Sequence, residues 1–261
     1  MSKVLDGHRT TGISQVGAAK FFWDGLSPQL RTRMTALGRI VDLPADHLLW
    51  EEDQRPGFVA VLLSGFLRML RYSADGRRQI MVIVPPGELV GEGVETRAGY
   101  RLEAATPVRL LRLERAAFER LMEEVPDIGR SIYRQCVGRL DRLQRMTWAL
   151  GLQSPEERLC AFLADACQVM PFEPGGAGGI LTMELPRADI ADYLGTTRET
   201  ISRLTHKLKA AGLIVILDPR RFEIPDIDRL ARAGACLSGR AAPALVAPRI
   251  AQGAQGVQQT A

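Results

Sequence analysis

The 261-residue sequence predicts an α+β fold in three successive parts: a β-roll, one long helix and a winged helix-turn-helix. Short apolar runs separated by glycine and proline turns fill residues 38–113, a pattern typical of a roll or barrel of antiparallel strands. Apolar residues at heptad spacing follow Pro126. Two helical patterns around a small-residue corner then occupy residues 187–211, which is typical of a helix-turn-helix.

The composition is that of a soluble globular protein, with 46% apolar and 25% charged residues. A formal net charge of +4 permits an anionic partner without requiring one. We find no apolar run long enough to span a membrane and no secretory signal at the start, so we expect a cytoplasmic protein with no membrane partner. The four cysteines and three histidines lack the spacing of a zinc site, so we expect no bound metal.

The first part of the chain is predicted to be a flexible N-terminus over residues 1–20, which are polar and lack periodicity. The β-roll domain is then predicted over residues 21–126. It opens with a helical segment over 21–37, in which Ser27 supplies the cap and Pro28 begins the first turn.

The strands of the roll are predicted from apolar runs rich in Val, Ile and Leu. Asp75-Gly76 lies between two such runs and predicts a β-hairpin. The runs are IVDLPADHLLWEED, FVAVLLSGFLRMLRY, RRQIMVIVPPGE and VRLLRLE.

A long helix is predicted over residues 127–151. Its heptad seam consists of residues spaced alternately three and four apart: Tyr133, Cys136, Leu140, Leu143, Thr147 and Leu150. Two interpretations fit this pattern. The helix packs on its own domain, or it pairs with the same helix of a second copy, and the pattern alone does not choose between them.

The C-terminal domain is predicted over residues 152–228. Ser154 and Pro155 provide a cap and a first-turn residue for its first helix. The glycine-rich segment 173–179 predicts a flexible turn. Residues 229–261 are rich in Ala, Gly, Pro and Gln and lack usable periodicity, so we expect a disordered tail.

The helix-turn-helix pattern depends on a sharp corner between its two helices. Gly195 allows the positive φ of such a corner, and Thr196 or Thr197 can cap the helix that follows. The inward-facing residues of that second helix are spaced three and four apart: Ile201, Leu204 and Leu208.

The outward side of the second helix carries a polar set suited to double-stranded DNA: Arg198, Glu199, Ser202 and Arg203. This end of such a helix faces base edges in the major groove, where arginine pairs with guanine and glutamate accepts from cytosine. Thr196, Thr197 and Lys207 are expected to contact phosphates. Two helices with solvated charges are the alternative, but the run GLIVILDPRRFEI predicts a wing turning at Asp218-Pro219, which favours DNA binding.

From Phe21 to Asp228 the chain resembles the Crp/Fnr family of bacterial transcription regulators. Three runs carry the resemblance: DGRRQIMVIVPPGELVGEG, LGLQSPEERLCAFLADA and IADYLGTTRETISRLTHKLKAAGLI. The resemblance implies that the roll is a cyclic-nucleotide-binding-like sensory domain and that the long helix forms a homodimer. It also implies DNA and RNA polymerase as partners.

The resemblance extends to the base-reading positions. Glu199 and Arg203 match the two positions that read bases across the family. Ser202 matches the serine of the Fnr branch, whereas Arg198 matches the arginine of the Crp branch. These matches imply an inverted repeat with half-sites resembling TTGA or TGTGA, and Arg198 leaves the outer base open.

The sequence departs from the family pattern at the residues that would bind an effector. Gly87 and Glu88, followed by Arg97 and Ala98, nearly match the cAMP pocket of Crp, but their spacing is short and the long helix lacks the expected Thr-Ser pair. We therefore expect no bound cAMP, with a structural turn and a solvated loop at these residues. The chain instead resembles the FixK-type branch, which implies a regulator that needs no bound cofactor.

The cysteines and histidines bear on two other signals, an iron–sulfur cluster and haem. No cysteine precedes Cys136, so the iron–sulfur cluster of Fnr is not expected, and His47 has no evident partner ligand for haem. Oxidation of Cys136 in the seam is an alternative to inert packing, and Cys160 and Cys167 are expected in the core.

Two other classes of function compete with a DNA-reading regulator. One is a cyclic-nucleotide-binding module that controls a partner without reading DNA, against which the exposed polar set of the second helix argues. The other is an enzyme, but the sequence presents no Cys/His or Ser/His/Asp arrangement, phosphate loop or metal set. We therefore expect no catalytic residues.

Overall fold

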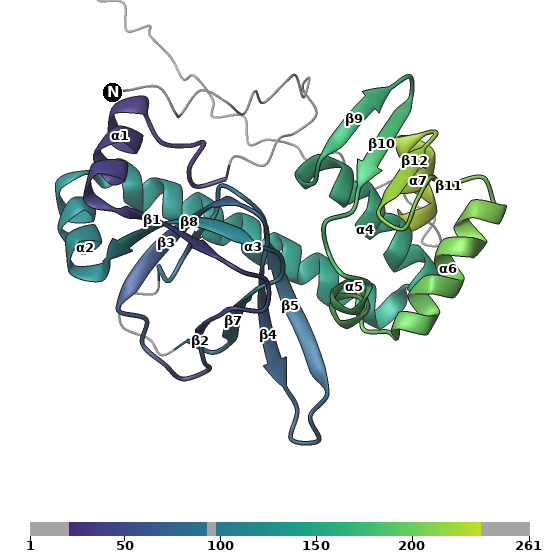
Figure 1. Ribbon diagram of the computed structural model, residues 1–261, viewed down its shortest axis with the longest axis horizontal. Coiled ribbons are helices and arrows are strands. Elements are labelled where there is room, and N and C mark those ends of the chain that lie inside the picture. The colour runs from purple at the N-terminus through teal and green to yellow at the C-terminus, as the bar shows by residue number, and fades with distance from the viewer. Residues whose placement is uncertain (1–20, 93–97, 236–261) are drawn as a thin grey trace, which may run out of the picture.

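The computed structural model describes residues 21–92 and 98–235, and the segments 1–20 and 236–261 lie outside them. A β-rich N-terminal domain is joined through the long helix α3 (Pro126–Leu152) to a smaller mixed C-terminal domain (Figure 1). This arrangement confirms the predicted fold class and the predicted long helix.

The N-terminal domain opens with α1 (Pro28–Leu37), which begins where the predicted cap lies. The Leu30 N–H donates to the Ser27 hydroxyl at 3.2 Å, so one of the unpaired donors of the first turn is satisfied. The helix α1 is shorter than the segment 21–37 that the sequence predicts. The residues before Ser27 form a turn whose Phe22 is buried in the core.

Among the described residues, eight strands form the roll as two antiparallel four-stranded sheets, in the orders β1-β8-β3-β6 and β2-β7-β4-β5. The predicted hairpin at Asp75-Gly76 joins β4 to β5, and Gly76 there has a φ of 81°. The strands are β1 (Arg39–Leu43), β2 (Leu48–Trp50), β3 (Phe58–Ser64), β4 (Leu67–Tyr72), β5 (Arg78–Val84), β6 (Leu89–Val90), β7 (Arg101–Ala104) and β8 (Val108–Glu114).

Strand β3 explains why its sequence is continuously apolar rather than alternating. Val59 and Val61 face a core shared with the helices, whereas Ala60 and Leu62 face the core between the two sheets. Both faces of the strand are therefore buried, so each successive side chain must be apolar. Its four central residues have no measurable exposure.

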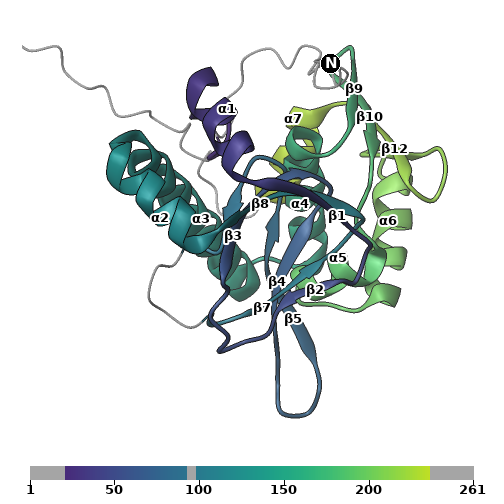
Figure 2. The same cartoon turned by 60° about the vertical axis from the view of Figure 1, so that its left-hand side comes forward.

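Two helices follow the roll, α2 (Arg115–Glu124) and α3, and they pack against each other (Figure 2). Gln135 of α3 is buried and makes a reciprocal pair with the backbone of β6. Its Oε1 accepts from Leu89 N at 2.7 Å and its Nε2 donates to Leu89 O at 2.9 Å. The long helix is thereby attached to the edge of the roll.

The C-terminal domain contains four helices and a small antiparallel sheet in the order β11-β12-β10-β9 within the described residues. Ser154 forms a capping box with Glu157 at the start of its first helix, as the predicted cap requires. The elements are α4 (Pro155–Val169), β9 (Phe172–Gly175), β10 (Gly178–Thr182), α5 (Arg187–Tyr193), α6 (Arg198–Ala210), β11 (Val215–Ile216), β12 (Arg221–Ile224) and α7 (Ile227–Ala235).

One sequence-based prediction is wrong in this domain, and a second is wrong for residues 229–235, whereas residues 236–261 of the predicted tail lie outside the described residues. The supposed flexible turn 173–179 lies almost wholly in the β9–β10 hairpin, where a Cβ on Gly178 would lie 1.7 Å from Ile224 O. This glycine serves close strand pairing rather than flexibility. Residues 229–235 of the supposed tail belong to α7, which packs on α4 and buries Leu230 completely.

The burial of two cysteines in α4 predicts their reactivity. Burial, together with nearby acidic groups, raises the pKa of Cys160 to about 11, and burial raises that of Cys167 to about 12. Because the thiolate is the reactive form, about one thiol in a thousand or fewer is reactive at pH 8. We expect iodoacetamide at pH 8 to leave both residues unmodified in the folded protein, as read by peptide mass spectrometry. The same protein in urea is the control, and equal labelling in both states would contradict the buried placement.

Candidate nucleic-acid interface

The corner between α5 and α6 has the geometry that its sequence predicts. Gly195 adopts a φ of 61°, and a Cβ there would lie 2.9 Å from Leu150 Cδ2. Thr197 is the N-cap of α6, and its hydroxyl accepts from Thr200 N at 3.2 Å. Thr196 contributes its backbone N–H, which donates to Ala191 O at 2.9 Å. The corner is therefore held by its own hydrogen bonds.

The amphipathic pattern of α6 separates a buried face from an exposed one. The three inward residues have relative exposures of 2% for Ile201, 8% for Leu204 and 0% for Leu208. On the other side Arg198, Glu199 and Arg203 are exposed and Ser202 is half-buried. The predicted base-reading residues therefore lie near the N-terminus of α6, on its exposed side.

The carboxylate of Glu199 is held in its ionised form. Hydrogen bonds from its own backbone N–H and from the Thr197 side chain lower the pKa of Glu199. An ionised carboxylate only accepts hydrogen bonds, which suits the exocyclic amine of cytosine. Its location in the first turn of α6 also places the negative charge at the positive end of the helix dipole.

Arg187 also lies on this surface, although the sequence pattern did not indicate it. It is exposed at the start of α5, and its Nη1 donates to Ser202 Oγ at 3.2 Å. The contact brings together residues fifteen positions apart on two crossing helices. The basic residue at the first position of the first helix was the available signal, but only the crossing of the helices places it beside α6.

The residues predicted to contact phosphates differ in their surroundings. Lys207 is exposed, and its ammonium group pairs with the Glu156 carboxylate of α4. The Thr197 hydroxyl serves as the cap described above. The turn between β11 and β12 confirms the predicted wing, and it presents Arg220 and Arg221 as exposed cations.

Two of the candidate effector residues, Gly87 and Glu88, lie where β5 leads into β6. Gly87 has a φ of 91°, and Glu88 beside it is completely buried. The Glu88 carboxylate pairs with Arg139 at 2.9 Å and with Arg142, both from α3. Ala98 donates its backbone N–H to Gln54 O at 3.0 Å, whereas Arg97 lies outside the described residues.

This ion network ties the long helix to the roll at a second point. Arg139 also pairs with Glu92 at 2.6 Å. Burial alone would lower the pKa of Arg139, but attraction to Glu92 and Glu88 raises it above the ordinary value. Each oxygen of Glu88 is therefore already bound to a guanidinium group of α3.

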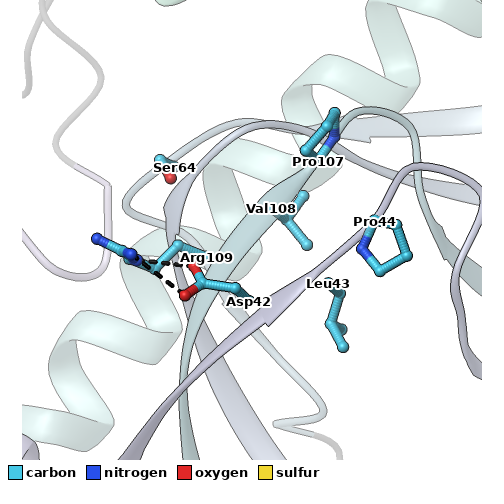
Figure 3. A pocket seen from close by; sticks show the side chains of 7 residues that line it. All are labelled: Asp42, Leu43, Pro44, Ser64, Pro107, Val108 and Arg109. Atoms are coloured by element: carbon cyan, nitrogen blue, oxygen red, sulfur yellow. Dashed lines mark hydrogen bonds and ion pairs between the residues drawn. The ribbon is translucent and has the colours of Figure 1, made fainter.

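A surface pocket of about 440 Å³ lies elsewhere on the roll, over β1 and the start of β8 (Figure 3). Its polar groups include Asp42 and Arg109, whose carboxylate and guanidinium pair with each other at 2.8 Å. Glu88 and its arginines do not line this pocket. The paired charges already satisfy each other there, so the pocket presents no concentrated charge to a ligand.

The predicted seam lies along α3 and is largely exposed. Tyr133 is 70% exposed, Leu140 53% and Leu150 41%, and Cys136 and Thr147 are also exposed. Leu143 differs because it is half-buried against the core of the roll. Val137 and Trp148 add exposed apolar surface that the heptad spacing did not include.

In the part of the chain that the structure describes, no cluster of His, Cys, Asp and Glu side chains could hold a metal ion. Among the same residues, no helix has both the length and the apolar character needed to cross a membrane.

Comparison with known proteins agrees with this geometry. Residues 157–233 match the family model of the Crp-like helix-turn-helix domain, and residues 40–125 match that of the cyclic nucleotide-binding domain. The nitrogen fixation regulation protein FixK of Bradyrhizobium diazoefficiens is 33% identical over 72% of this chain and 81% of its own. The transcriptional activator protein FnrL of Cereibacter sphaeroides is 29% identical over 70% of this chain and 75% of its own. The structure of FixK2 from Bradyrhizobium japonicum matches with a TM-score of 0.68 at 23% identity, covering 75% of this chain and 96% of its own.

Proposed function

This chain belongs to the Crp/Fnr family of transcription regulators, and we propose that it reads an inverted repeat of double-stranded DNA as a homodimer. The observation that carries the proposal is the division of α6 into a buried apolar face and an exposed polar start. A helix built in this way can enter the major groove without unfolding its own domain. Such a regulator acts in the bacterial cytoplasm, together with RNA polymerase.

The base-reading roles follow from side-chain chemistry. Arg203 and Arg198 each carry a planar fork of donors that fits guanine O6 and N7. Glu199 accepts from cytosine N4, and Ser202 serves either base edge or phosphate. Arg187, which already contacts Ser202, extends this set toward the backbone of the duplex. We propose half-sites of the TTGA or TGTGA type, with Arg198 determining the outer base.

The exposed seam of α3 supports the dimer. Tyr133, Leu140 and Leu150 form part of an apolar stripe that the single chain leaves uncovered within the described residues. Burying it against a second copy removes apolar area from water and places two reading helices in a symmetric pair. That symmetry matches an inverted repeat in the DNA.

We also propose that DNA binding needs neither a cyclic nucleotide nor an iron–sulfur cluster. Glu88, the acidic member of the candidate effector residues, already has its two oxygens bound by Arg139 and Arg142. A ligand hydroxyl would have to displace a buried charge pair in order to reach it, which is costly. The protein's role is binding rather than catalysis, in keeping with the regulators of its family.

The competing function is a regulator that requires a bound cyclic nucleotide. The match of residues 40–125 to the cyclic nucleotide-binding domain is the observation that favours it. A ligand would then have to rearrange the pairs of Glu88 with α3, so its effect on DNA binding separates the two functions.

Selection of DNA sequences by the purified protein tests the proposal directly. We expect an inverted repeat with TTGA- or TGTGA-type half-sites to be enriched without added ligand, both in air and with reductant. Enrichment only with reductant would indicate a thiol switch at a cysteine. Enrichment only after cAMP is added would establish the nucleotide-dependent alternative, and no enrichment in any condition would disprove DNA reading.

Arg203→Ala tests the assignment of the reading helix. We expect a loss of about 1–3 kcal/mol per half-site in binding to the selected repeat, because one bidentate base contact disappears. Nonspecific binding at low salt should remain, since it depends on phosphate contacts. Arg232→Ala, which removes an equal charge from an exposed residue of α7, is the matched control. Retained sequence preference in Arg203→Ala, measured by fluorescence anisotropy, would contradict the role.

Leu140→Asp tests the seam. We expect the dissociation constant of the dimer to rise at least about a hundredfold, because each of two symmetry-related copies would bury an unpaired carboxylate. Sedimentation velocity measures this change. Leu37→Asp, at a comparably exposed leucine of α1, is the control and should leave the dimer intact. An unchanged dimer in Leu140→Asp would place the interface elsewhere.

A further inference from the structure

The two domains meet at a buried carboxylate that belongs to α5. Asp189 has a side chain only 2% exposed. Its Oδ2 accepts from Arg68 Nη1 of β4 at 2.8 Å, and its Oδ1 accepts from Arg78 Nη2 of β5 at 2.7 Å. One oxygen thus binds each strand of the hairpin.

The same hairpin binds the end of α5. Arg78 Nε donates to Asp192 Oδ2 at 2.6 Å. Gln79 Nε2 donates to the backbone oxygen of Asp192 at 2.7 Å, at the last turn of the helix. We call Arg68, Arg78, Asp189 and Asp192 the interdomain ion network. It contacts α5 near both of its ends.

Burial makes these contacts costly to break. Arg68 is 5% exposed and also binds Glu103 on the neighbouring strand β7, at 2.7 Å. A buried charge that loses its partner is strongly unfavourable, so α5 cannot slide along the hairpin without breaking pairs that water cannot replace. The apolar core continues across the same boundary, since Phe66 and Ala105 of the roll belong to the C-terminal core cluster.

The roll therefore fixes two elements at once. It binds α3 through the Gln135 pair with β6 and the Glu88 pairs, and it binds α5 through the interdomain ion network. The reading face stays open in this arrangement, because Arg198 and Arg203 of α6 are exposed while the network is closed. The network therefore does not cover Arg198 or Arg203.

We propose that Arg78 and Arg68 are positioning residues for DNA recognition: by holding α5 they set the distance and angle of α6 from the dimer axis, and so the spacing of the two half-sites. This inference rests on the proposed function. They touch no base, and they act through Asp189 and Asp192. One base pair of extra spacing rotates a half-site by about 34° and moves it by about 3.4 Å, which a rigidly held pair of helices cannot follow.

The test is binding of the full-length protein to the selected inverted repeat with its spacer shortened or lengthened by one base pair. For the wild type we expect one preferred spacer. For Arg78→Gln, a partly exposed position that should tolerate the change, we expect affinity at that spacer to fall about tenfold. Affinity at the other spacers should fall less, so the preference flattens, while half-site sequence preference stays unchanged. Asp192→Asn should flatten the profile in the same way, and Arg78→Lys should restore part of it.

Arg77→Gln is the matched control. Arg77 has the same charge and the same hairpin but is highly exposed and pairs with Asp75 beside it, so this variant should keep the wild-type spacer profile. If Arg78→Gln weakens every spacer equally, the network is only structural and the inference is overturned. Tighter binding in Arg78→Gln would also overturn it, because the network would then be inhibitory. If the wild type itself selects no repeat, the proposed function fails, and this inference fails with it.

Discussion

The placement of the reading helix depends on one buried carboxylate. Asp189 is bound by two guanidinium groups of another domain, at 2.8 Å and 2.7 Å. A charge with 2% of its side chain exposed is tolerated only while its partners remain in place. The helix-turn-helix unit therefore takes its orientation from the roll. Apolar packing across the boundary supplies contact area, but the ion pairs supply direction, because a guanidinium group donates hydrogen bonds to a carboxylate only in particular geometries.

The roll uses the same principle where it meets the long helix. Glu88 is buried and bound by Arg139 and Arg142, and Gln135 forms two hydrogen bonds with the edge of β6. In each case a polar group of one element satisfies a buried polar group of another. Strand β3 is apolar on both faces because one face packs against the helices and the other against the second sheet. The domain thus combines a nonspecific apolar core with a small number of specific polar attachments.

The two functional surfaces are the ones that local folding leaves unsatisfied. On α6 the apolar residues are buried inside the domain, and the polar residues at its start remain available for an anionic duplex. On α3 the reverse holds, because Tyr133 and Leu140 remain exposed although they are apolar. An exposed polar set and an exposed apolar stripe favour different partners, which we propose are DNA for the first and a second copy of the chain for the second.

The sequence by itself determined the features that depend on neighbouring residues. Ser27 and Ser154 cap their helices, Gly76 and Gly195 form their turns, and the spacing along α6 assigns its buried face. Tertiary structure decided what depends on residues far apart in the chain. Examples are the strand role of Gly178, the helix α7 in a segment that reads as a tail, and the contact of Arg187 with Ser202. It also decided that Asp189 and Glu88 are buried with arginines as partners. Local propensity describes a few residues at a time, whereas the pairing of buried charges is decided by which elements the whole fold brings together.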